Sequence, residues 1–115
     1  MNKLTEKNVG ALVLLKIKNK KNKNAINLIN KLIKKEKYAE KYEFYIYKKS
    51  IHLHEKYSNS DKWIKHIDHF DLIFDNQITN VFKIEKIFSY GKISSKLKAK
   101  LKNFGAINYS LLKAK

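Results

Sequence analysis

Residues 50–70, SIHLHEKYSNSDKWIKHIDHF, change their hydrophobic period halfway along the stretch. Up to Tyr57 apolar and polar residues alternate, which predicts a strand with one buried face. After Tyr57 the apolar residues recur every three or four positions, which predicts a helix capped by Ser60 or Asn59. The fold must therefore bury the apolar face of this strand and the apolar stripe of the helix that directly follows it.

The same stretch holds an unusual set of polar side chains. All four histidines and the only tryptophan lie within it. Glu55 falls on the apolar side of the predicted strand, next to Tyr57, and the predicted helix carries His66 and His69. A carboxylate on the buried face of a strand departs from ordinary core patterning, so we expect the functional site here.

The remaining segments give the order of elements. The predicted strands cover residues 9–17, 42–47, 51–57, 81–90 and 106–112. The predicted helices cover residues 25–41, capped by Asn24, then a segment from Ser60 to Ile78 with a bend at 68–71, and a short helix that starts at Ser94 or Ser95 and ends before Gly105. Gly91 is expected to end the fourth strand.

This order predicts an α+β protein with the ferredoxin-like split βαβ arrangement, in which helices cover one face of an antiparallel sheet. The chain is expected to form a single domain over residues 1–115, with residues 1–8 frayed and an extra C-terminal helix and short strand. The strands carry too many apolar side chains for one sheet face, so we expect a homodimer that packs sheet to sheet. The side chains behind this expectation are Val9, Leu12, Leu14, Phe44, Tyr45 and Tyr47.

Composition narrows the class of protein. The net charge is +16, but all 26 basic residues are lysines. Arginine is the residue that forms paired hydrogen bonds with guanine edges and with phosphate, and it is absent. We therefore expect no specific nucleic-acid partner. Cysteine is absent, which excludes disulfides and thiolate sites. No signal peptide or membrane-spanning run occurs, so the expectation is a soluble, cytoplasmic protein without a membrane partner.

Several short motifs, in this order, resemble the antibiotic biosynthesis monooxygenase family of small dimeric α+β barrels. In that family a glutamate, one further residue, an aromatic and a small polar residue precede a helix that bears a histidine, as Glu55, Tyr57, Ser58 and His66 do here. The closing segment is similar to a subgroup of quinol monooxygenases. Its matching residues are Tyr90, Gly91, Ser95, Leu97, Leu101, Phe104, Gly105, Ala106 and Tyr109.

The resemblance implies an enzyme that oxidises a flat phenol or quinol with molecular oxygen, using no metal, flavin or other cofactor. Such a reaction needs a base, an apolar cavity for the ring and a donor for the oxyanion. Glu55, His66 and Tyr57 are the predicted catalytic residues. The predicted ligand-binding wall comprises Val13, Tyr42, Leu53, Trp63, Phe70 and Phe74.

Other interpretations of the same residues stay open. Trp63 and Tyr57 also suit a plain core, Glu55 also suits an ion pair, and His66 also suits the core boundary. The cavity also suits non-catalytic binding of a small aromatic or acyl molecule. The strand pair His52 and His54 and the helix pair His66 and His69 have chelating spacings, but they lie on different layers, so no metal site is expected.

Overall fold

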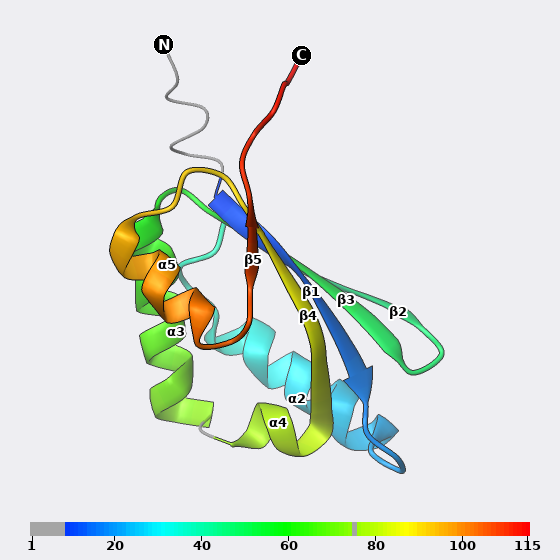
Figure 1. Cartoon of the computed structure of the whole chain (residues 1–115). Helices are drawn as coiled ribbons and strands as arrows, with labels where there is room; N and C mark the ends of the chain where they lie inside the picture. The colour runs from blue at the N-terminus through cyan, green and yellow to red at the C-terminus, as the bar shows by residue number, and fades with distance from the viewer. Residues whose placement is uncertain (1–8, 75) are drawn as a thin grey trace.

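A five-stranded sheet with the order β2-β3-β1-β4-β5 forms the centre of the molecule (Figure 1). The computed structural model describes residues 9–74 and 76–115. The strands are β1 Val9–Ile17, β2 Lys41–Tyr47, β3 Ser50–Tyr57, β4 Phe82–Tyr90 and β5 Ile107–Tyr109. Central β1 pairs antiparallel with both β3 and β4, β2 pairs antiparallel with β3, and β5 adds a short parallel edge beside β4. The predicted α+β, ferredoxin-like fold with a C-terminal helix and strand is confirmed.

The helices lie on one face of this sheet (Figure 1). They are α2 Asn22–Lys35, α3 Ser60–Phe74, α4 Gln77–Val81 and α5 Ser95–Lys102. Alternation in β1 sends Val9, Ala11, Val13, Leu15 and Ile17 into the core beneath the helices. The intervening residues of β1 face the other side of the sheet. The hydrophobic core therefore lies between the helices and this face of the sheet.

Three predicted features of the helices are wrong. The first helix begins at Asn22, where Lys21 is the N-cap and makes no side-chain hydrogen bond, so Asn24 is no cap. It also ends at Lys35, because Glu36 has extended backbone and turns its side chain to other partners. The predicted bend at residues 68–71 is absent, since α3 runs unbroken to Phe74.

Two predicted helix ends are confirmed, the cap at the start of α3 and the glycine after α5. Asn59 Oδ1 accepts the backbone N–H of Lys62 at 2.9 Å, so Asn59 caps the start of α3. Gly105 follows α5 with φ of 72°, the left-handed conformation that glycine adopts without strain. The final strand is shorter than predicted and covers Ile107–Tyr109.

Strand β4 contains a bulge that the alternation did not indicate. Opposite Leu14 and Leu15 of β1 stand Lys86 and Ile84, so Glu85 is an extra residue. The extra residue lets both Ile84 and Ile87 point to the covered face. Without it, one of these two isoleucines would face outward.

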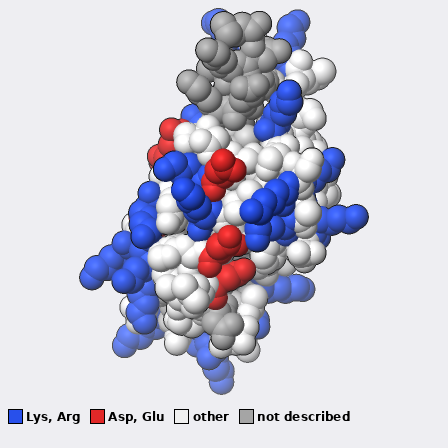
Figure 2. All heavy atoms as spheres, turned by 90° about the vertical axis from the view of Figure 1, so that its left-hand side faces the viewer, with Lys and Arg blue, Asp and Glu red and all other residues white. Residues whose placement is uncertain are grey.

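Lysines are spread over the helical side of the molecule. Figure 2 views the side formed by α3 and α5 and shows lysines on much of this face with a few carboxylates between them. Lys100 of α5 forms an ion pair with Asp68 of α3 at 2.9 Å. None of the described helices is long and apolar enough to cross a bilayer. The predicted frayed segment, residues 1–8, lies outside the described residues.

Close contact of β1 and β3 at Gly10 yields a first prediction. A Cβ on Gly10 would lie 2.2 Å from the Glu55 carbonyl oxygen, whereas one on Gly105 would meet nothing within 4 Å. We expect Gly10→Ala to lower the free energy of unfolding by about 3 kcal/mol, because two paired strands would have to separate. The control, Gly105→Ala, should cost about 1 kcal/mol, from its positive φ alone. Urea unfolding measures both, and an equal cost for the two variants would contradict the prediction.

Candidate functional site

A chain of buried polar side chains lies beneath the helices. His66 Nδ1 is 2.6 Å from Glu36 Oε1, and His66 Nε2 is 3.8 Å from Glu55 Oε1. Tyr57 donates its hydroxyl to the same Glu55 oxygen at 2.6 Å. The side chains of His66, Glu36 and Glu55 are 10%, 6% and 7% exposed. The structure thus brings together the three predicted catalytic residues and adds a second carboxylate.

Three different segments of the chain position these four groups. Alternation in β3 points Glu55 and Tyr57 inward on the same face. His66 lies on the buried stripe of α3, beside Trp63 and Phe70. Glu36 follows the last turn of α2, and its Oε2 accepts the backbone N–H groups of the loop that leads to β2. Three segments therefore converge on one imidazole.

The two carboxylates have opposite pKa shifts. Burial raises the pKa of Glu55 above its ordinary value of 4.5, and the nearby imidazole of His66 and the Tyr57 hydrogen bond offset only part of this. Burial also acts to raise the pKa of Glu36, but its bond to His66 and the N–H groups of Tyr38 and Ala39 outweigh it and lower the pKa. Glu36 is thus an ionised acceptor, and Glu55 is the more easily protonated group.

The hydrogen-bond partners assign a role to each ring nitrogen of His66. In the neutral imidazole we assign the hydrogen to Nδ1, because that nitrogen faces a carboxylate which also accepts Tyr38 N–H at 2.8 Å and Ala39 N–H at 2.7 Å. Nε2 then carries a lone pair toward Glu55, and 3.8 Å is beyond a direct hydrogen bond. A hydroxyl group placed between them would be within reach of both.

Two tyrosines near this chain, Tyr57 and Tyr42, have raised pKa values and are neutral. Burial and the charge of Glu55 raise the pKa of Tyr57 far above its ordinary value. The pKa of Tyr42 is raised in the same way, first by burial and then by the charges of Glu55 and Glu36. Tyr57 also stacks on Trp63, with ring centroids 5.1 Å apart and planes 12° from parallel. The indole therefore holds the phenol that donates to Glu55.

An apolar pocket of about 150 Å³ opens beside Glu55 and His66. Its walls come from the inner faces of β1, β3 and β4 and from α3, α4 and α5. The lining residues are Ala11, Val13, Leu15, Leu53, Glu55, Trp63, His66, Ile67, Ile78, Ile84, Ile87, Leu101 and Phe104. A cavity of about this size holds one benzene ring.

Only three of the six predicted ligand-binding residues line this pocket. Val13, Leu53 and Trp63 line the pocket. Tyr42, Phe70 and Phe74 are not among its lining residues. They form a separate aromatic group, in which Phe70 is 4.3 Å from the His66 ring, 6.2 Å from Tyr42 and 5.0 Å from Phe74, centroid to centroid. This group packs against the imidazole.

Glu36 is the site residue that the sequence patterns did not single out. It lies in a run of lysines at residues 34–37, which is typical of a solvated helix end. A weak signal exists, because no other Asp or Glu occurs between residues 7 and 39. Its partner is 30 positions away, so no local spacing connects them.

The four histidines separate as expected. His52 and His54 lie on the uncovered sheet face, opposite to Glu55, and His54 packs against Tyr45. His69 lies one turn beyond His66 and packs edge-on against Tyr38. Within residues 9–74 and 76–115, no three His, Asp or Glu side chains form a metal-binding group.

The comparisons with known proteins give the fold. No family model matches the chain, and no curated protein matches it. Among solved structures it is similar to MupZ from Pseudomonas fluorescens, with a TM-score of 0.84 and 16% identity over 95% of this chain and 93% of that one. It is also similar to a conserved protein from Methanosarcina mazei Go1, with a TM-score of 0.62 and 22% identity over 76% and 95%. At these identities the likeness shows a shared fold.

The opposite shifts of the two carboxylates predict opposite effects of neutralising them. The lowered pKa of Glu36 stabilises the fold above pH 4.5, and this stabilisation is lost as the pH falls through the lowered value. The raised pKa of Glu55 favours the fold below 4.5, and this contribution is lost as the pH rises. At pH 7 we expect Glu36→Gln to cost about 2 kcal/mol. Glu55→Gln should stabilise the fold by on the order of 1 kcal/mol.

Urea unfolding at pH 7 and at about pH 3.5 measures these effects against the wild type at the same pH. Both differences should shrink at the lower pH, where the unfolded carboxyl groups are protonated. A Glu36→Gln variant as stable as the wild type at pH 7, or a Glu55→Gln variant less stable, would show that the assigned charge states are wrong.

Proposed function

We propose that the protein is a small cofactor-independent monooxygenase that oxidises a flat phenol or quinol with O2. One observation carries the proposal. His66 lines an apolar pocket the size of one ring together with Glu55, which its Nε2 faces at 3.8 Å, while its Nδ1 is 2.6 Å from Glu36. A carboxylate that holds the far nitrogen keeps the imidazole in one tautomer and stabilises it once protonated.

The proposed reaction begins with proton removal. Nε2 of His66 takes the hydroxyl proton of the bound phenol, which makes the ring electron-rich enough to react with O2. One oxygen atom of O2 becomes bonded to a ring carbon, the other leaves as water, and the ring becomes a quinone. The phenol supplies all four electrons, so the balance requires no added reductant.

Glu55 and Tyr57 act beside the base in this proposal. Burial raises the pKa of Glu55 above its ordinary value, which suits this carboxyl group to the proton transfers that accompany loss of water. Tyr57 donates at 2.6 Å and keeps the carboxyl group oriented toward His66. Val13, Leu53 and Trp63 would contact the ring.

The motif resemblance to the antibiotic biosynthesis monooxygenase family supports the same chemistry. The order of Glu55, Tyr57 and His66 matches that family's pattern, and the ferredoxin-like fold is the one it uses. Fold alone does not determine function, so the proposal depends on the polar chain and the pocket.

A second function, binding without catalysis, is favoured by a specific observation. The pocket lining is apolar except for Glu55 and His66, and both already have partners within the protein. A small aromatic or acyl molecule would fit such a site with no reaction.

Oxygen consumption with a panel of phenols and quinols tests the proposal. We expect turnover by the wild type and a loss of about 100-fold or more in kcat for His66→Ala, because a general base contributes about that much. Glu36→Gln and Glu55→Gln should each lower kcat as well. Lys65→Ala, at an exposed position of α3 that does not line the pocket and lies away from the sheet, is the control and should keep full activity.

Two results would contradict the oxygenase proposal. The first is no oxygen uptake by the wild type with any substrate. The second is equal uptake by wild type and His66→Ala. If mass spectrometry of the denatured protein then finds a bound aromatic or acyl molecule, binding without catalysis is the function.

The uncovered sheet face supports a homodimer. Tyr45, Tyr47, Tyr90 and Tyr109 are 55%, 73%, 43% and 47% exposed on or beside it. A hollow of about 450 Å³ lies above Gly10, between neighbouring side chains of β1, β3 and β4. Exposed aromatic area of this extent is typical of an interface. We propose that a second copy packs on it, sheet to sheet.

Light scattering at micromolar concentration tests the dimer. The wild type should have the mass of two chains, and Leu12→Glu, in the middle of the outer face of β1, should have the mass of one. Lys98→Glu on α5 introduces the same side chain away from the sheet and should remain dimeric. A wild-type mass of one chain would contradict the dimer.

A further inference from the structure

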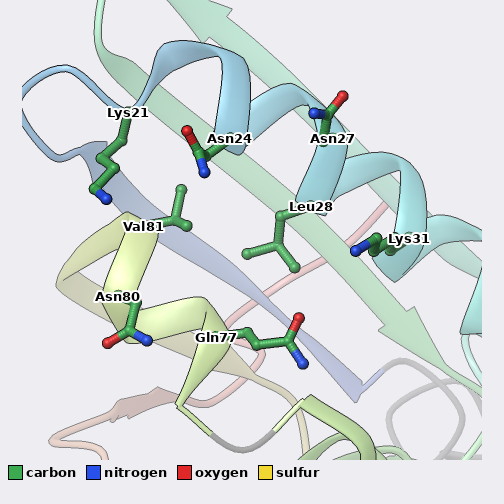
Figure 3. Close-up of a pocket in the computed structure, with 8 residues that line it drawn as sticks. All are labelled: Lys21, Asn24, Asn27, Leu28, Lys31, Gln77, Asn80 and Val81. Carbon is green, nitrogen blue, oxygen red and sulfur yellow. The ribbon is translucent and has the colours of Figure 1, made fainter.

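A second hollow, separate from the polar chain, is a groove of about 370 Å³ between α2 and α4. Asn24 and Asn27 lie three residues apart on one side of α2, and Gln77 and Asn80 have the same spacing on α4, so each pair shares a helix face. Figure 3 shows Asn24 and Gln77 beside the space between the two helices. The groove is therefore bordered by four carboxamides from two elements.

The carboxamides and the base of the groove suit a polyhydroxylated molecule. Each carboxamide both donates and accepts hydrogen bonds, which is what a row of hydroxyl groups requires. Between the helices lie Leu28 and Val81, both buried, which offer apolar contact to C–H groups. In Figure 3 these two side chains point toward each other from α2 and α4. A volume of this size is at the lower end of the range for small-molecule sites, about 300–1,000 Å³.

The groove also carries positive charge at both ends. Figure 3 shows Lys21 at one end and Lys31 at the other. Ten residues of helix separate them by about 15 Å. No Asp or Glu occurs in residues 9–35 or 76–84, the segments that form the walls. Glu36, the next acidic residue after α2, is bound to His66, and Asp75 lies outside the described residues.

We propose that this groove binds a small phosphorylated sugar or polyol. The hydroxyl groups would bond to the carboxamides of Asn24 and Gln77, which lie beside the groove, and the phosphate would lie against Lys21 or Lys31, since a lysine ammonium binds phosphate as a point charge. This site is independent of the proposed oxygenase activity.

A nucleic acid suits the groove less well. Proteins that bind single strands use aromatic side chains as stacking platforms, and the lining of this groove contains none. The wall formed by α4 is five residues long, which limits the groove to a short ligand. Its polar contacts are carboxamides and lysines, and the chain has no arginine.

Titration calorimetry with glucose 6-phosphate, ribose 5-phosphate and glycerol 3-phosphate tests the proposal, with glucose and inorganic phosphate as partial probes. We expect at least one phosphorylated compound to bind more tightly than glucose or phosphate alone. Lys21→Gln combined with Lys31→Gln should weaken that binding by about fivefold or more. Asn24→Leu combined with Gln77→Leu should weaken it while leaving the weak binding of inorganic phosphate unchanged.

The control variant combines Lys98→Gln with Lys102→Gln, which removes the same charge from exposed positions on α5. It should bind as the wild type does, and circular dichroism confirms that every variant is folded. The proposal is overturned if no phosphorylated probe binds at millimolar concentration, or if the control variant weakens binding as much as the groove variant. It is also overturned if a ten-nucleotide RNA binds more tightly through Lys21 and Lys31.

Discussion

The contact between His66 and Glu36 joins two segments that are 30 positions apart in the sequence. It connects the end of α2 to the middle of α3, at 2.6 Å and with little exposure to solvent. A buried carboxylate is costly unless it is fully hydrogen-bonded, and Glu36 meets this condition by also accepting two backbone N–H groups. The loop from α2 to β2 and the position of α3 on the sheet are thus set by one carboxylate.

The consequence for chemistry is an imidazole with two different sides. Its Nδ1 side is occupied by a strong bond to an ionised group, and its Nε2 side faces Glu55 across 3.8 Å beside an apolar pocket. The aromatic group around Phe70 packs against the ring and holds its orientation. An imidazole held in this way has a fixed orientation, which is what the proposed proton transfer requires.

Strand β3 serves both faces of the sheet because successive side chains point in opposite directions. Glu55 and Tyr57 face the pocket, while His54 faces the uncovered side beside Tyr45. The fold shared with MupZ, at 16% identity over nearly the whole chain, indicates that this frame tolerates almost complete replacement of side chains. The function therefore depends on the few residues that the frame brings together.

The sequence by itself determined what depends on local period and local caps. The switch of period at residues 58–60, the inward direction of Glu55, the separation of the histidine pairs, the Asn59 cap and the left-handed Gly105 follow from residues within a few positions of one another. The order of strands and helices then restricts the sheet to the observed topology. These local patterns account for the fold and for three of the four residues of the polar chain, Glu55, Tyr57 and His66.

Only the tertiary structure decided which residues meet across elements. Glu36 looked like part of a solvated lysine run, and its true partner is 30 positions away. The early end of α2, the bulge at Glu85 and the exclusion of Phe70 from the pocket have the same origin. A repeating pattern states which face of its own element a side chain occupies. Which residue of another element contacts that side chain depends on how the elements pack and on whether a buried charge finds a partner. Both depend on the whole chain.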